Sequence, residues 1–163
     1  MKKVLFLVLL ALLALPGFCF AAGTMVLASD PVMDRSNAGI TVSLNWVGDS
    51  STGTVPAKTT NQLTDAAGRT VSSYISGYFF YAASFDPGTP SPTASYSVVI
   101  TDALGATIAT FSSLSATAST YNNAGASGYI FALAPLLPWT ITLSGNSVAS
   151  AQGKIIFSFV TAH

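Results

Sequence analysis

The stretch GITVSLNWV, residues 39–47, alternates apolar and polar side chains without a break. Its apolar side chains are Ile40, Val42, Leu44 and Trp46. Successive side chains of a β-strand point to opposite faces of a sheet, so this period of two predicts a half-buried strand. Threonine, valine, isoleucine and tryptophan also suit a pleated surface. The segment therefore predicts a strand with one face in a core and the other in solvent.

The same alternation recurs in residues 94–101, 139–144 and 153–161. Clusters of Gly, Pro, Asn, Asp and Ser stand between these runs, and no segment after residue 22 has a convincing apolar stripe of helical period. Several short strands joined by turns predict an all-β fold. We expect a single antiparallel β-sandwich of about seven to nine strands, Ig-like or jelly-roll-like. The uncharged run IIFSFV (155–160) belongs either to an interior strand or to a sheet edge that pairs with another chain.

The N-terminus has the three parts of a secretory signal peptide. Lys2 and Lys3 give a positive start, residues 4–15 are continuously apolar, and small residues follow at Ala21 and Ala22. We therefore expect a signal helix in this segment and cleavage after one of these two alanines.

Two regions follow from this interpretation: a signal peptide over residues 1–22 and a β-sandwich domain over 23–163. Cys19 offers lipid attachment as an alternative, although the bulky Phe18 precedes it where lipidation sites favour a small residue. The expected location is extracellular, periplasmic, at the cell surface or in a virion. The chain would meet a membrane only through the signal peptide before cleavage.

Charge is scarce in the remaining chain. Without Lys2 and Lys3, four cations stand against six aspartates, which gives a net charge of −2. Four scattered cations cannot neutralise a phosphate track, so the composition excludes a nucleic-acid partner. A surface without charge repulsion suits a subunit that packs against its own copies or other structural proteins. An ordinary extracellular domain with a Ser/Thr-rich face is the alternative.

Residues for catalysis are missing. The sole histidine is His163, the last residue, and Cys19 lies in the leader. Nucleophilic triads need a positioned base, and His/Cys metal sites need ligands that this chain does not have. The six aspartates all stand in turn-like or N-terminal contexts, which does not indicate paired-carboxylate chemistry. We expect a non-enzymatic protein with no metal and no cofactor.

One turn motif occurs twice, as TDAAGRTV (64–71) and TDALGATI (101–108). An aspartate at the start of a short loop accepts hydrogen bonds from its own downstream amides, and glycine three residues later takes a positive φ. The turn-forming residues are Asp65 with Gly68 and Asp102 with Gly105. We interpret both motifs as hairpin corners, each followed by a new strand. Neither turn has the several oxygen ligands that calcium prefers.

Partner contacts are predicted at three residues. Most aromatic residues lie in strand runs and belong to the core, whereas Tyr121 lies in the loop before NNAG (122–125) and should be exposed. In YIFALAPLLPW (129–139), two prolines form a corner that holds Leu136 and Leu137. These leucines either cap the end of the core, which we favour, or form an exposed apolar contact.

Three stretches together carry a family resemblance. They are NWVGDSSTGTVPA (45–57), GYFFYAASFDPGTPSPTASYSVVITDALG (77–105) and WTITLSGNSVASAQGKIIFSFV (139–160). In these turns and strands the chain resembles small β-rich proteins of bacteriophage and prophage genomes. The resemblance implies a virion-associated structural role and brings no catalytic residues. The expected function is therefore that of an exported structural or assembly protein. The alternative is a secreted carbohydrate-binding or adhesive module that uses exposed tyrosines.

Overall fold

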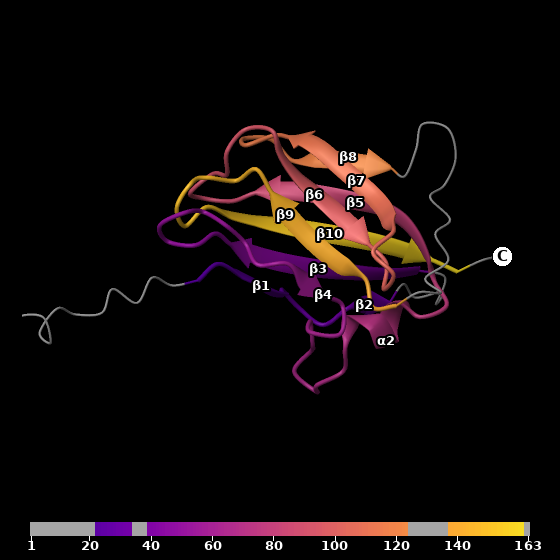
Figure 1. The fold of residues 1–163 in the computed structure, drawn as a ribbon. Coiled ribbons are helices and arrows are strands. Elements are labelled where there is room, and N and C mark those ends of the chain that lie inside the picture. The colour runs from indigo at the N-terminus through magenta and orange to yellow at the C-terminus, as the bar shows by residue number, and fades with distance from the viewer. Residues whose placement is uncertain (1–21, 34–38, 124–136, 162–163) are drawn as a thin grey trace, which may run out of the picture.

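The computed structural model describes residues 22–33, 39–123 and 137–161. Strand β3 (Gly39–Val47) is the alternating strand that the sequence predicts, with its four apolar side chains buried. It pairs along its whole length with β10 (Gln152–Val160), and β10 pairs on its other side with β5 (Phe79–Pro87). Because β10 has a neighbour on each side, the alternative that placed its uncharged run at a sheet edge is wrong (Figure 1).

Two antiparallel sheets contain all the strands of the described residues, so the prediction of a mostly β, antiparallel fold is confirmed. We call the larger one sheet A: its order is β1 (Thr24–Leu27), β3, β10, β5 and β8 (Thr120–Asn123), with β2 (Val32–Met33) also paired to β3. We call the smaller one sheet B: its order is β4 (Lys58–Thr59), β9 (Thr140–Ser144), β6 (Tyr96–Thr101) and β7 (Thr107–Leu114). The six strands of sheet A and the four of sheet B exceed the predicted seven to nine strands, because strands as short as the two-residue β2 and β4 are included.

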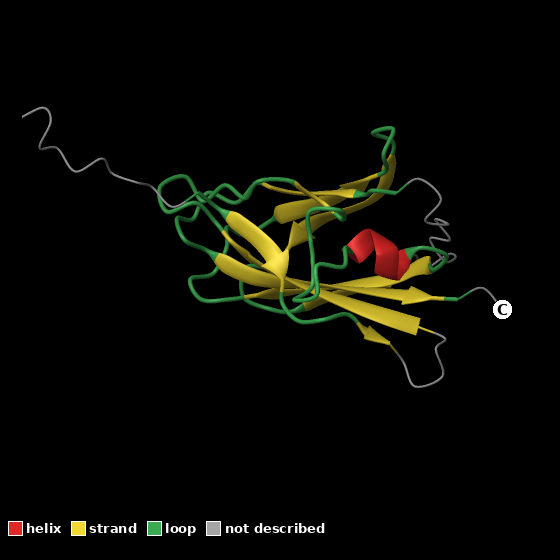
Figure 2. Cartoon of the chain, turned by 90° about the horizontal axis from the view of Figure 1, so that it is seen from below, coloured by secondary structure: helices red, strands yellow, loops and turns green. Residues whose placement is uncertain are grey.

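One hydrophobic core joins the two sheets, which form two layers in Figure 2. Ring pairs cross from sheet to sheet: Phe85 lies 4.9 Å from Phe111, and Trp46 lies 5.9 Å from Tyr96, between ring centroids. Such tilted aromatic contacts add to the burial of apolar area that drives the sheets together. The side chains predicted for the core in residues 94–101, 139–144 and 153–161 are all buried.

A short helix, α2 (Val71–Ile75), has no counterpart in the sequence predictions. Thr70 caps it by accepting a hydrogen bond from the Ser73 amide, and Val71 and Ile75 bury their side chains four residues apart. This helix is too short to show a periodic stripe in the sequence. Within the described segments, no helix is long and apolar enough to cross a membrane. The expected signal helix lies almost entirely outside the described residues.

Candidate functional site

The predicted contact residues fall in different places. Tyr121 is 60% exposed, but it lies in strand β8 of sheet A and not in a loop. It stands directly opposite Ser84 of β5. Leu137 is half-buried and packs against the core, which is the capping arrangement, whereas Leu136 lies outside the described residues.

Both copies of the turn motif have the same geometry. The Asp102 carboxylate accepts hydrogen bonds from the amides of Leu104 and Ala106, at 2.9 and 2.8 Å. Asp65 bonds the two equivalent amides, at 2.9 and 2.8 Å. Gly68 and Gly105 have φ values of 81° and 84°. The second copy joins the hairpin β6–β7, whereas the first is followed by α2, so the prediction that a strand restarts there is wrong.

Asp65 has partners that its twin Asp102 lacks among the described residues. Its buried carboxylate accepts a hydrogen bond from the Tyr74 hydroxyl at 2.5 Å and forms an ion pair with Arg69 Nε at 2.7 Å. The hydrogen bond from Tyr74, together with the bonds and charge of Arg69, lowers the pKa of Asp65 to about 2. Arg69 also lies over the Tyr74 ring. The cluster fixes the start of α2, and both oxygens of the Asp65 carboxylate are hydrogen-bonded within the chain, which indicates a structural role.

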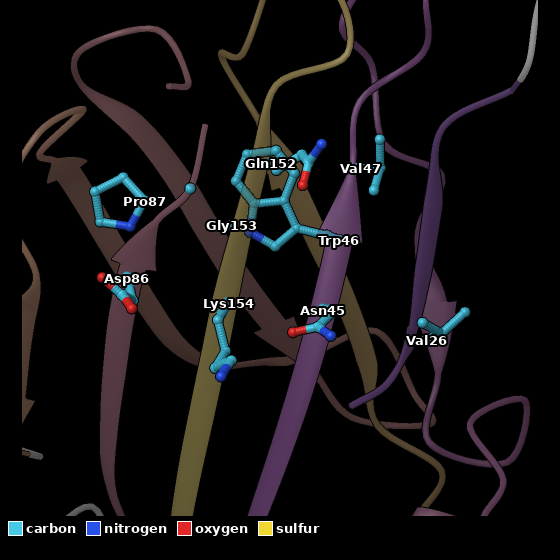
Figure 3. A pocket seen from close by; sticks show the side chains of 10 residues that line it. Val26, Asn45, Trp46, Val47, Asp86, Pro87, Gln152, Gly153 and Lys154 are labelled. Carbon is cyan, nitrogen blue, oxygen red and sulfur yellow. The ribbon is translucent and has the colours of Figure 1, made fainter. Parts of the chain in front are cut away.

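An open pocket of about 450 Å³ crosses sheet A on the face turned away from the core (Figure 3). One wall is a row of side chains that pair directly across four neighbouring strands: Val26, Asn45, Lys154 and Asp86. The opposite wall contains Val47 and Gln152. Figure 3 shows the two rows on either side of the β10 backbone at Gly153. The register of the sheet therefore builds the pocket from segments far apart in the sequence.

The floor of the pocket is thin at Gly153. This residue pairs with Trp46, and the indole ring of Trp46 lies against it on the core side. A Cβ atom at position 153 would lie 2.6 Å from Cζ2 of the indole. The missing side chain thus makes room for the buried tryptophan, which supports the pocket floor from beneath.

Lys154 and Asp86 are the only charged residues in the strands of sheet A. They are cross-strand neighbours of opposite sign. In the described part of the chain, however, the only ion pair within 4.0 Å joins Arg69 to Asp65. Asp86 instead accepts a hydrogen bond from the Ser119 hydroxyl at 2.7 Å. The ammonium group of Lys154 and one Asp86 oxygen therefore remain available for a ligand or partner.

The neighbouring amide side chains are available as well. Asn45 and Gln152 are exposed and make no side-chain hydrogen bond with the described residues. The pocket therefore offers donors and acceptors side by side on a face with no net charge, with Val26 and Val47 as apolar neighbours. This arrangement suits non-covalent contact with a polar, uncharged or self-complementary surface. Within the described segments, no group of three or more metal-binding side chains occurs.

The edges of both sheets are protected against pairing with another chain. Three of the outer strands, β1, β4 and β8, have four residues or fewer. The long outer strand β7 is irregular, because its register with β6 shifts at two places. Short edge strands and bulges are the common devices that prevent edge-to-edge association. Contact with a partner is therefore better placed on a sheet face than on an edge.

Asn146 holds the loops at the pocket's end of the molecule. Its buried amide donates to the Gly53 carbonyl at 2.6 Å and accepts from the Thr93 amide at 3.0 Å. The loop before Thr93 contains Gly88, a lining residue of the pocket, which bonds the Gln152 carbonyl at 2.8 Å. The buried Asn146 side chain thus connects three loops near the end of the pocket: those that contain Gly53, Thr93 and Asn146 itself.

Sequence reasoning found Tyr121 but missed the pocket residues. Asn45, Asp86 and Lys154 are far apart in the chain, and only the strand register brings them together. The alternation predicted the strands of Asn45 and Lys154 but not β5, which carries Asp86, and alternation alone cannot pair strands. No protein-family model, curated protein or solved structure matches this chain.

Proposed function

We propose that the protein is an exported, non-enzymatic structural subunit, virion-associated and of phage descent, that packs against other subunits. Its architecture is a single β-sandwich of the Ig-like or jelly-roll-like type. The observation that carries the proposal is the outer face of sheet A, which holds exposed Tyr121, Val26 and Val47 and one pair of opposite charges. A nearly uncharged, partly apolar face has little to keep a neighbouring subunit away.

The test is the size of the exported protein as a function of concentration, measured by sedimentation velocity. Ser84→Arg places a bulky charge at the centre of the outer face of sheet A. Thr142→Arg makes the same change at an outward, half-buried position on an interior strand of sheet B. We expect concentration-dependent assembly of the wild-type protein, its loss in the first variant and its retention in the second. A wild-type protein that remains monomeric at high concentration contradicts the proposal.

A second candidate function is a secreted carbohydrate-binding or adhesive module. The observation that favours it is the exposed ring of Tyr121, diagonal to Asp86 on the same face. Ring faces pack against sugar C–H groups, and the free amides of Asn45 and Gln152 can exchange hydrogen bonds with hydroxyl groups. A glycan-binding screen tests this function. Tyr121→Ala should abolish any binding found, whereas Leu104→Ala, at an exposed turn beside sheet B, should not.

A further inference from the structure

Two side chains of opposite charge stand side by side on the exposed face of sheet A, but they do not form an ion pair with each other. Lys154 of β10 and Asp86 of β5 are directly opposite in the register, yet they form no ion pair within 4.0 Å. We propose that the partner of this face is a second copy of the chain, related by a two-fold axis, so that each Lys154 meets Asp86 of the other copy. This inference rests on the proposed function and names the partner.

The sheet geometry allows this exchange. A two-fold axis that runs parallel to the strands, between β10 and β5, reverses the strand order of the second copy but keeps the height along each strand. It therefore places β10 of each copy over β5 of the other. Lys154 and Asp86 lie at the same height, about 4.8 Å apart across the strands. The axis thus brings both charges of each copy onto their opposites in one symmetric contact.

The same operation fits large side chains to small ones. The next row of the outer face, directly paired across the strands, consists of Ser43, Ile156, Ser84 and Tyr121. Reversing the strand order places Tyr121 over Ser43 of the second copy and Ile156 over Ser84. An exposed ring and a half-buried aliphatic side chain each meet a serine, which leaves room for them. Large-on-small packing of this kind lets two faces interdigitate.

A second copy of the chain complements the charges of Lys154 and Asp86 better than a partner whose surface carries charges of a single sign. An acidic surface would meet Asp86, and a basic surface would meet Lys154, with repulsion in either case. The face itself carries one charge of each sign and is its own complement. No other charged residue lies in the strands of sheet A to oppose the contact.

The face is large enough for a weak dimer. Strands β3 and β10 each have nine residues, and five strands lie side by side. These dimensions correspond to a face of roughly 30 by 19 Å. This rectangle has an area of about 570 Å², and the face is smaller still because β1 and β8 have only four residues each. It lies below the ~800 Å² per partner of a standard interface and in the range of weak, transient contacts. Exposed ion pairs contribute little affinity, so the two charge contacts set register and partner choice more than strength.

Substitutions that reverse one or both charges test the inference, with the dimerisation of the exported protein measured by sedimentation velocity. Asp86→Lys makes the pair wholly positive, and Lys154→Asp makes it wholly negative. We expect each variant alone to dimerise at least on the order of tenfold more weakly than wild type, because like charges then face each other. An equimolar mixture should form a heterodimer, and the double variant Asp86→Lys/Lys154→Asp should recover the homodimer. Circular dichroism melting of each variant establishes that the fold is kept.

The outcomes separate the two proposals. A dimer that is lost in Ser84→Arg but unaffected by either charge reversal overturns the second-copy arrangement and leaves the proposed function in place. Single variants that dimerise like wild type, or a mixture that stays monomeric, also overturn it. A wild-type protein that never associates overturns the proposed function itself.

Discussion

The close approach of Trp46 to Gly153 gives a prediction about the pocket floor. In Gly153→Ala, the new methyl group would lie 2.6 Å from the indole Cζ2 atom and 2.7 Å from Cε2 and Nε1. Gly153 does not have a positive φ, so alanine fits the backbone and the cost is purely steric. Overpacking of a buried ring costs about 1–3 kcal/mol. At about 4 °C per kcal/mol for a chain of this size, the Tm should fall by roughly 4–12 °C.

Thermal and urea unfolding measure this effect, and a double-mutant cycle with Trp46→Phe assigns it. The smaller ring removes most of the clash, so Gly153→Ala should cost at least about 1 kcal/mol less in the Trp46→Phe background. If Gly153→Ala were as stable as wild type or more stable, the indole would not lie against position 153. Equal costs in both backgrounds would also refute the reasoning.

Three further predictions concern stability. Asn146→Ala leaves the Gly53 carbonyl and the Thr93 amide without their partner and should cost about 3 kcal/mol in urea unfolding, whereas exposed Asn61→Ala should be near neutral. The pKa of Asp65 falls from 3.8 to about 2 on folding, so its stabilisation is present above pH 4 and is lost as the pH falls towards 2. Thermal melts at several pH values should show this acid loss reduced in Asp65→Asn. Tyr96→Phe removes a buried hydroxyl that has no partner among the described residues, and it should raise the free energy of unfolding by about 1 kcal/mol. Burial also raises the pKa of Tyr96 to about 12, so the wild-type protein loses stability between pH 10 and 12. Tyr96→Phe should reduce this alkaline loss of stability.

Local patterns in the sequence predicted the parts of the fold that depend on local physics. The alternation in β3, β6, β9 and β10 places the same side chains in the core that the structure buries. The repeated Asp-x-x-Gly motif forms the same turn twice because the aspartate bonds its own downstream amides. These features depend on residues only a few positions apart, and such patterns are visible in a single chain.

Features that depend on distant contacts were not predictable in this way. The order that places β10 between β3 and β5 follows from the assembly of the whole sheet. The segment at Tyr121 reads as a loop because it is polar and rich in asparagine, and only its pairing with β5 makes it a strand. Helix α2 follows a turn whose twin leads into a strand, so the local motif does not decide what comes after it.

A dilution series of amide chemical shifts from the exported protein tests most directly whether the outer face of sheet A is the contact surface. We expect the shifts that depend on concentration to gather at Ser43, Ser84, Tyr121 and Lys154, while Val99 and Thr142 on the outer face of sheet B stay constant. Concentration-dependent shifts that gather on sheet B, or a spectrum that does not change with concentration, would contradict this account.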